Sequence, residues 1–379
     1  MLVQCSFNVV CVTEMWKDFR TKHSSQSATT VSYELYRRVF EEENITFGQP
    51  SQDDCEICTA FNRHHSDLTE HPPDCAICAA SREHLERAKN ARHEYHKTNS
   101  GKTYAADMQK IILLPKLTTK QHFFVSRLVV FNETFACLNE GENDIAVLWH
   151  EAINGRNAAD VAAAYVKCLE LSNSPTVTIW ADNCCGQNKN WTLFTTMCLC
   201  VNQEWGPNEV TIKYLEKGHT YMKADSIHGS IGKKLKKQAE ILTFPDFVDL
   251  VDSSSKFLKP VVLGTADFYE FSAENRTRKT KNVTLPLLTN ICSVTFKKDS
   301  RLMFFKTDFS QEDTAVDFLK PKFNVSSSFP SPHTKHRGIS SSKRDGILQL
   351  LKEVPSTKKK FWLELTTCET SRDLVTNLE

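Results

Sequence analysis

The sequence predicts an α/β protein in which a mixed β-sheet is flanked by helices. A cysteine- and histidine-rich segment precedes the sheet, and a small helical unit follows it. Three observations carry this prediction. Compact apolar runs of strand type alternate with helical patterns between residues 104 and 238, which is typical of a sheet with helices on its faces. Paired cysteines occur before that region, and a Ser/Pro/His/Lys-rich stretch separates it from the last segment.

Length and composition exclude several classes of protein. A chain of 379 residues predicts two or three domains, at about 100–200 residues per domain. Its 47 basic and 46 acidic residues give a net charge of +1, so a protein that acts through bulk positive charge is excluded. With 40% hydrophobic and 25% charged residues, the chain has the composition of a globular protein. No apolar run reaches the roughly 18 residues of a membrane span, and the first residues lack the pattern of a secretion signal.

The helical elements follow from apolar residues spaced three or four apart, from capping residues and from charged runs with few strand formers. We expect helices over 32–40, 81–97, 158–169 with Asn157 as the N-cap, 191–201 and 226–238. The strands follow from short runs of β-branched and aromatic residues. We expect a strand over 108–114 closed by Pro115, a hairpin or two short strands over 123–135, and strands over 176–180 and 210–215.

Shifts in composition divide the chain into six segments, without an internal repeat. The expected order is a helical and loop segment over 1–50, a Cys/His-rich module over 51–100, an α/β core over 101–240, an α/β extension over 241–325, a linker over 326–343 and a small helical unit over 344–379.

Two cysteine pairs form the most specific local pattern. Cys55 and Cys58 are separated by 16 residues from Cys75 and Cys78, which fits the spacing of zinc sites. Each pair can grip one ion from a tight turn, and two pairs complete a tetrahedron, so we expect one structural Zn²⁺ site. Nearby histidines can replace a thiolate: His84, which we include among the ligands, and His64, His65 and His71. The alternative is four unrelated thiols.

A dense polar run follows the strand expected at 176–180. Asp182 places a carboxylate where this strand ends, and the carboxyl ends of strands are where open α/β sheets place their sites. The amides and the ammonium group that follow suit phosphate or nucleic acid: Asn183, Gln187, Asn188 and Lys189. The alternative is that the Asp-Asn pair only caps the next helix.

A second polar segment lies before the helix expected at 226–238. Asp225 stands at the helix start, where the macrodipole favours a carboxylate even without any catalytic role. His219 and His228 flank it, and we place both near phosphates, together with the basic side chains of Lys233 and Lys234. A solvated basic face is the alternative for the two lysines.

Asp107 completes a pattern of three carboxylates. In a ribonuclease-H-like fold, one carboxylate lies on the first strand, one at the end of the fourth and one in a helix after the fifth. With the hairpin counted as strands two and three, Asp107, Asp182 and Asp225 occupy these positions. Clustered carboxylates can hold Mg²⁺ or Mn²⁺ for phosphoryl transfer. The sequence therefore predicts a ribonuclease-H-like core with three catalytic aspartates.

Two motifs resemble a known family. They are Asp-Asn-Cys-Cys-Gly-Gln-Asn-Lys-Asn at 182–190 and Gly-His-Thr-Tyr-Met-Lys-Ala-Asp-Ser-Ile-His at 218–228. The chain resembles transposon-derived, uncharacterised animal proteins that carry a domain of unknown function and look like transposases with a ribonuclease-H-like core. Similarity covers about residues 33–365 and includes the segments 50–58, 84–88, 107–109 and 149–151.

The resemblance implies a metal-dependent DNA strand-transfer enzyme, with DNA as partner, a possible homo-oligomer and no membrane association. It also implies that the protein resides in the nucleus, and the alternative is the cytoplasm. The basic runs Lys233–Lys237 and Lys358–Lys360 could serve as a nuclear localisation signal, but short basic runs are common. The chain departs from the family where relatives carry an Ile-Glu pair, because Ile231 is followed by Gly232. A second hypothesis is therefore a catalytically dead protein that binds nucleic acid or protein on the same fold. A thiol enzyme using Cys184 or Cys185 is disfavoured, since no adjacent base is evident.

Overall fold

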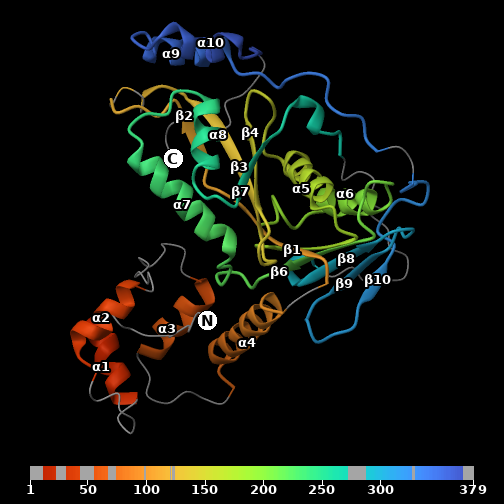
Figure 1. Cartoon of the computed structure of the whole chain (residues 1–379). Coiled ribbons are helices and arrows are strands. Elements are labelled where there is room, and N and C mark those ends of the chain that lie inside the picture. The colour runs from red at the N-terminus through yellow and green to blue at the C-terminus, as the bar shows by residue number, and fades with distance from the viewer. Residues whose placement is uncertain are drawn as a thin grey trace. The chain divides into compact units, whose positions relative to one another are not determined.

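The computed structural model describes residues 12–22, 31–42, 55–66, 74–97, 100–119, 121, 124–271, 287–326 and 329–369. The chain divides into two compact units, Met1–Asp54 and Cys55–Glu379, and Figure 1 shows the whole chain. Within the first unit, helices α1 (Val12–Lys22) and α2 (Tyr33–Glu42) form a pair. The Trp16 ring lies 5.8 Å from that of Tyr33, and its Nε1 donates to the Val31 carbonyl at 3.0 Å. Helix α2 confirms the helix expected over 32–40.

The second unit is built on one ten-stranded mixed sheet with the order β10-β9-β8-β6-β5-β1-β3-β4-β7, and β2 pairs with β3 off this path. The strands are β1 (Lys102–Met108), β2 (Ile112–Leu114), β3 (Leu128–Cys137), β4 (Asp144–His150), β5 (Thr176–Ala181), β6 (Glu209–Tyr214), β7 (Leu258–Val262), β8 (Ser293–Lys297), β9 (Met303–Lys306) and β10 (Thr314–Val316). The expected extension over 241–325 therefore adds its strands to the same sheet as the core.

The five central strands decide where side chains can meet. Strand β1 is antiparallel to β3, which is antiparallel to β4, whereas β1, β5 and β6 are mutually parallel. The carboxyl ends of β1 and β5 therefore lie at the same edge of the sheet. Their register pairs Ala106 with Ala181, so the residues that follow these two positions emerge side by side.

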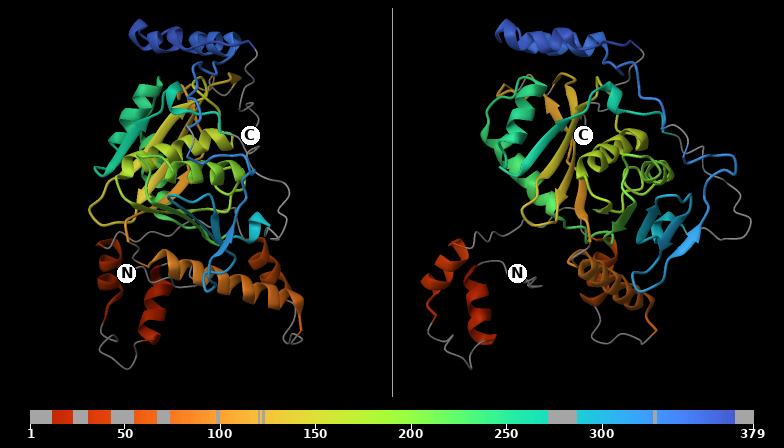
Figure 2. Two further views of the ribbon diagram at one scale, coloured as in Figure 1. Left: turned by 90° about the vertical axis from the view of Figure 1, so that its right-hand side faces the viewer. Right: turned by 45° about the vertical axis from the view of Figure 1, so that its right-hand side comes forward.

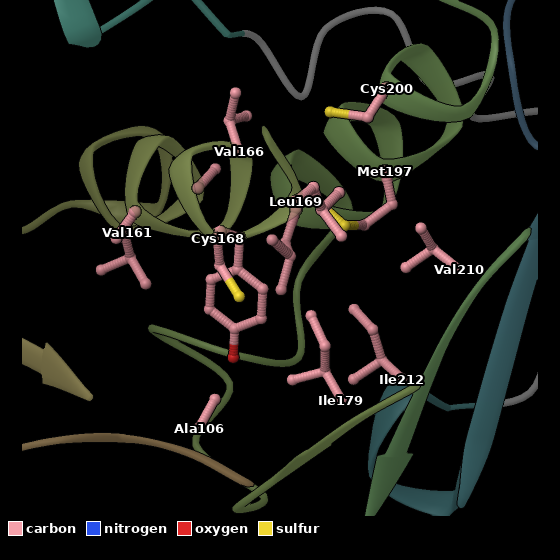
Figure 3. Packing of buried hydrophobic residues seen from close by; sticks show 14 of the residues in the cluster. Ala106, Val161, Val166, Cys168, Leu169, Ile179, Met197, Cys200, Val210 and Ile212 are labelled. Atoms are coloured by element: carbon pink, nitrogen blue, oxygen red, sulfur yellow. The ribbon is translucent and has the colours of Figure 1, made fainter. Parts of the chain in front are cut away.

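Helices cover both faces of the sheet, as Figures 1 and 2 show. One face carries α5 (Ala158–Ser172) and α6 (Trp191–Val201), and the other carries α7 (Lys223–Lys237) and α8 (Phe244–Asp252). Alternation along β1 explains the two cores, because Tyr104 and Ala106 pack with α5 and α6 while Ala105 packs with α7 and α8. Figure 3 shows α5 and α6 packed over strand residues such as Ile179 and Ile212. The mixed α/β architecture confirms the predicted fold class at this level.

The carboxyl-terminal helices α9 (Ser341–Leu350) and α10 (Ser356–Glu364) join the core on the α7 side. Trp362 is fully buried, and its Nε1 donates to the Leu242 carbonyl at 3.1 Å. Lys343 lies in a buried ion pair with Glu151, which directly follows β4. Two 3₁₀ turns, Thr265–Asp267 and Leu288–Asn290, complete the unit with helices α3 and α4, described below. None of the helices described is both long and apolar enough to cross a membrane.

Two strand predictions are wrong in their boundaries. The strand expected over 108–114 is β1 ending at Met108 and a separate β2, because the chain leaves the ladder at Gln109 and Lys110. The hairpin expected over 123–135 is instead formed by β3 and β4, which extends to His150. Strand β3 is buried along its whole length. Its polar residues did not indicate this burial, because polar residues are usually found in exposed segments. Strand β2 is additional to the expected strands and pairs with β3 off the main path of the sheet. With β2 set aside, β3 and β4 take the places of the expected second and third strands.

Candidate metal and active site

Three aspartates converge at the carboxyl edge of the parallel strands. Asp107 is the penultimate residue of β1, and Asp182 follows β5 directly. The β1–β5 register continues from the pair Ala106 and Ala181 to these two residues. Asp225 is the third residue of α7, which packs on the same face of the sheet. Three separate elements thus deliver the carboxylates that the sequence predicted.

The tightest group at this edge consists of Asp107, Asp225 and His228. Each offers a ligand atom within 4.8 Å of the other two, and His228 Nδ1 lies 3.4 Å from Asp107 Oδ2. The Nε2 atom of His228 is buried without a hydrogen-bond partner among the described residues. Asp182 lies outside this group, but its charge interacts with both aspartates. The site therefore concentrates negative charge in the way that a divalent cation requires.

Asp182 is held in place by its own loop. Its Oδ1 accepts hydrogen bonds from the Cys184 backbone N–H at 3.0 Å and from Asn188 Nδ2 at 2.6 Å. Burial raises the pKa of Asp182 above its ordinary value, and the charges of Asp107 and Asp225 raise it further, against the effect of the two hydrogen bonds. A cation at this edge would oppose both causes, because carboxylates must be ionised to coordinate a metal.

Asp225 has a capping role as well as a place in the group. Its Oδ2 accepts a hydrogen bond from the Met222 backbone N–H at 2.7 Å and so caps the first turn of α7. Partial burial raises the pKa of Asp225, and the charge of Asp107 adds to this effect. The capping role does not exclude a role in the site, because a carboxylate has two oxygens.

Gln109 ties the strands to α7 and was missed by sequence reasoning. Its Nε2 donates to the His228 carbonyl at 3.4 Å, and its Oε1 accepts from Asn132 Nδ2 at 3.0 Å. Asn132 is fully buried on β3. This chain of contacts fixes the turn of α7 that carries His228 against the end of β1. Gln109 lies two residues after Asp107, and only the fold reveals its partner.

The prediction that Asn188 and Lys189 contact nucleic acid needs correction. Both are fully buried, so neither reaches a phosphate. Lys189 Nζ donates to Asn183 Oδ1 at 2.6 Å and lies 4.5 Å from the centre of the Tyr214 ring; burial lowers its pKa to about 8. Asn188 accepts a hydrogen bond from the Tyr165 hydroxyl at 2.9 Å. These side chains build the loop that presents Asp182.

The other predicted nucleic-acid contacts lie in different places. Asn183 Nδ2 donates to the Leu215 carbonyl, and Gln187 Nε2 lies 3.7 Å from Met108 Sδ. Lys233 is exposed on α7, while Lys234 Nζ donates to the Ser253 carbonyl. Among all residues predicted to contact nucleic acid, His228 is the one that lies in the group with Asp107 and Asp225.

Glu133 is a further carboxylate that the sequence did not reveal. It lies on β3, fully buried, and neither carboxylate oxygen has a hydrogen-bond partner among the described residues. Burial raises its pKa well above the ordinary value, and the charges of Asp107 and Asp182 act in the same direction. A carboxyl group whose neutral form is favoured by burial therefore lies beneath the site. Its strand carries polar residues, so the sequence did not indicate that the strand is buried.

The cysteines and histidines form two groups instead of the one expected. Cys55 and Cys58 meet His84 and His219, whereas Cys75 and Cys78 meet His64. The two cysteine pairs stand at the starts of separate helices, α3 (Glu56–Ser66) and α4 (Ala76–Tyr95), so they do not share one group. His219, expected near phosphates, lies instead with its Nε2 3.4 Å from Cys58 Sγ. Each group could hold a metal ion; His65 and His71 lie outside the described side chains.

His84 is oriented from behind by an acidic residue. Its Nε2 lies 3.1 Å from Cys55 Sγ, and its Nδ1 lies 2.9 Å from Glu216 Oε1. The same oxygen accepts hydrogen bonds from Arg87 Nε at 3.2 Å and Nη2 at 3.0 Å. Histidines that ligate metals usually bond their second nitrogen in this manner. Burial and the neighbouring Cys55 raise the pKa of Cys58 to about 11, so a bound cation would be needed to hold Cys58 as a thiolate near neutral pH.

Comparison with known proteins gives one match. Residues 163–322 match a family described as a domain of unknown function (DUF7869). The matched region contains Asp182 and Asp225, whereas Asp107 and the two cysteine pairs precede it. No curated protein and no solved structure matches the chain. This part of the chain is thus similar to a family that is defined by its sequence and not by an assigned activity.

Proposed function

We propose that this protein is a divalent-metal-dependent DNA strand-transfer nuclease of the transposase type. The observation that carries the proposal is that Asp107 and Asp225 lie in one group at the edge of the sheet, with Asp182 following the strand next to that of Asp107. Phosphoryl-transfer enzymes use such carboxylate clusters to bind the cations that act on phosphodiesters.

The order of the central strands supports a ribonuclease-H-like core. From one side it runs β4, β3, β1, β5 and β6, with the first three antiparallel and the last three parallel. With β2 left out because it lies off this path, these are strands three, two, one, four and five in chain order. The three aspartates then lie on the first strand, after the fourth and in the helix after the fifth, as the resemblance implies.

The residues at the edge have distinct roles in this proposal. Asp107 and Asp182, side by side on adjacent strands, would hold Mg²⁺ or Mn²⁺, and Asp225 approaches from α7; oxygen ligands are those that these ions prefer. A divalent cation bound there supplies stabilisation of the charge on the attacking and leaving oxygens. His228, 3.4 Å from Asp107, places a group that can exchange a proton beside the carboxylates.

Gly232 favours a second candidate, a catalytically dead nucleic-acid-binding or interaction protein. It lies on α7, four residues after His228 and seven after Asp225, and therefore on the same face of the helix. A Cβ atom added at Gly232 would meet nothing within 4 Å, so a glutamate would fit there. If the relatives' glutamate is a metal ligand, this chain has lost it, and Asp225 must act in its place for the site to function.

Nicking of supercoiled plasmid in Mg²⁺ or Mn²⁺ tests both candidates, with wild type, Asp182→Asn and Gly232→Glu compared. If the site is active, the wild-type protein nicks the plasmid and the Asp182→Asn variant does not. Inactive wild type with activity gained by Gly232→Glu supports the dead-site candidate. Inactivity of all three, with each protein folded by circular dichroism, contradicts the nuclease.

DNA binding would use local basic surface, because the net charge is only +1. The exposed Lys233 and its basic neighbours at the end of α7 are the proposed phosphate contacts. The affinity should then fall steeply as salt rises, since binding releases counterions. Nuclear residence belongs to the same proposal.

A further inference from the structure

The first two helices of the second unit carry a repeat that the sequence analysis overlooked. Cys55, Cys58 and His64 have the same spacing as Cys75, Cys78 and His84, twenty residues later, and both copies contain Cys-x-Ile-Cys-x-Ala-x-x-x-His. The copies correspond to α3 and α4, each of which starts at its cysteine pair.

The histidine of each helix lies beside the cysteine pair of the other helix. His84 of the second copy lies 3.1 Å from Cys55 Sγ, and His64 of the first copy lies 3.1 Å from Cys75 Sγ. This pattern requires α3 and α4 to run antiparallel, so that the start of each helix meets the later part of the other. Each group consequently takes two thiols from one helix and one imidazole from its neighbour, which is why the two cysteine pairs cannot combine.

The first group fits a tetrahedral zinc ion. Zinc lies about 2.3 Å from sulfur and about 2.1 Å from nitrogen, which separates a sulfur and a nitrogen ligand by about 3.6 Å. The two Sγ–Nε2 distances in the group are 3.1 and 3.4 Å, and all four ligand atoms lie within 4.8 Å. Glu216 behind His84 completes the arrangement that zinc-binding histidines favour.

The fourth ligand of the first group comes from a distant part of the chain. His219 lies in the segment between β6 and α7, and this segment is held closely against the hairpin. Gly218 adopts φ +78°, and a Cβ atom there would lie 2.6 Å from that of Cys55. Arg92 on α4 donates to the Tyr221 carbonyl at 2.6 Å and to the His219 carbonyl at 3.2 Å. The segment leads directly into α7, which carries Asp225.

We propose that the α3–α4 hairpin binds two zinc ions, one at Cys55, Cys58, His84 and His219 and the other at Cys75, Cys78 and His64. The first ion fastens the segment before α7 to the hairpin and so sets the position of the helix that carries Asp225. The second ion closes the far end of the hairpin, with its fourth position left to water or a further side chain. This inference does not depend on nuclease activity.

Metal stoichiometry of the full chain gives the first test. Purified protein should contain two zinc ions per chain by plasma mass spectrometry. Cobalt substituted for zinc should show thiolate-to-metal charge-transfer absorption corresponding to two thiolates per ion. One ion per chain with the absorption of four thiolates would overturn the proposal in favour of a single four-cysteine site, and the absence of tightly bound zinc would overturn it altogether.

Single variants separate the two sites. His219→Ala and His64→Ala should each weaken one ion, so that a chelator removes about one zinc per chain while the other remains. His93→Ala is the matched control, because His93 is an exposed histidine of α4 outside both groups. Equal zinc retention in His219→Ala and His93→Ala would contradict the assignment of the fourth ligand.

Hydrogen exchange tests the coupling to α7. His219→Ala should increase amide exchange in residues 215–225, whereas His64→Ala should leave that segment unchanged, since its ion lies at the other end of the hairpin. Equal exchange of this segment in both variants would refute the fastening role. Nicking assays are not used here, so failure of the proposed function and failure of this inference remain distinguishable.

Discussion

Replacing Asp107 by asparagine should stabilise the protein without Mg²⁺ and destabilise it, relative to wild type, when Mg²⁺ is present. In the absence of a divalent cation, Asp107 and Asp225 place carboxylate oxygens within 4.8 Å of each other. Two charges at this distance repel by about 1 kcal/mol in water and about 3 kcal/mol at the effective dielectric constant of a protein surface. Asp225 is exposed as a residue although its carboxylate is partly desolvated. Solvent therefore screens the repulsion, the lower value applies, and Asp107→Asn should stabilise the metal-free site by about 1 kcal/mol. The amide can still hydrogen-bond His228.

The sign changes once Mg²⁺ binds. At a concentration about 100 times its dissociation constant, a ligand that binds only the folded state stabilises it by about 2.7 kcal/mol. Wild type should gain this amount, whereas the Asp107→Asn variant lacks a ligand and should gain little. The variant then passes from about 1 kcal/mol more stable than wild type to about 2 kcal/mol less stable.

Urea unfolding with and without Mg²⁺, followed by circular dichroism, measures these differences. Asp249→Asn serves as the control, because Asp249 is an exposed carboxylate on α8, away from the site. If Mg²⁺ stabilises wild type, Asp107→Asn and Asp249→Asn equally, the aspartates do not form a cation site and the reasoning is refuted.

Three further predictions concern stability. Burial raises the pKa of Glu133 in the folded protein, so wild type should lose up to ~1.4 kcal/mol of stability per pH unit between the unfolded pKa of about 4.3 and the raised folded pKa. Glu133→Gln should remove this loss, and parallel pH profiles of unfolding for the two proteins would exclude it. Lys343→Met removes the nearer partner of buried Glu151 and leaves it only the Arg337 guanidinium at 3.7 Å. The substitution should therefore cost up to about 3–5 kcal/mol in urea unfolding, while a loss below about 1 kcal/mol would show that the pair contributes little. Gly218→Ala should lower zinc retention and stability, because Gly218 has a positive φ that alanine adopts only with strain. Gly229→Ala, in open space on α7, should instead raise the melting temperature slightly. Equal behaviour of the two alanine variants would argue against strain at Gly218.

Local patterns predicted the elements whose signals lie within a few residues. Helix α5 has the N-cap that the sequence indicates, since Asn157 accepts hydrogen bonds from Ala159 and Asp160. Helix α6 begins and ends where its apolar run does, and β5 follows Pro175 as expected. These elements are set by capping and burial of their own residues, so the sequence sufficed.

Elements and contacts that depend on distant partners could not be predicted in the same way. Strand β3 carries Asn132 and Glu133 in its buried centre, and only pairing with β1 and β4 makes a core strand of them. Lys189 resembles a phosphate ligand in sequence, but the fold places it over the Tyr214 ring.

The candidate site shows the same division. The positions of the three aspartates at strand and helix ends followed from element order, because parallel strands bring their carboxyl ends together. The closeness of Asp225 to Asp107 did not follow, since it depends on how α7 packs. The grouping of cysteines with histidines required the antiparallel hairpin, although the repeat that encodes it was visible in the spacing.

Anomalous diffraction from crystals grown with Mn²⁺ tests the central claim most directly. The account predicts a manganese peak at the carboxyl edge of β1 and β5, in contact with Asp107 and Asp182, and its disappearance in Asp182→Asn crystals grown in the same way. Data collected at the manganese and zinc edges distinguish this peak from ions at the cysteine groups. A well-ordered edge without manganese in wild-type crystals, at millimolar Mn²⁺, would contradict the proposal that these aspartates form a metal-dependent active site.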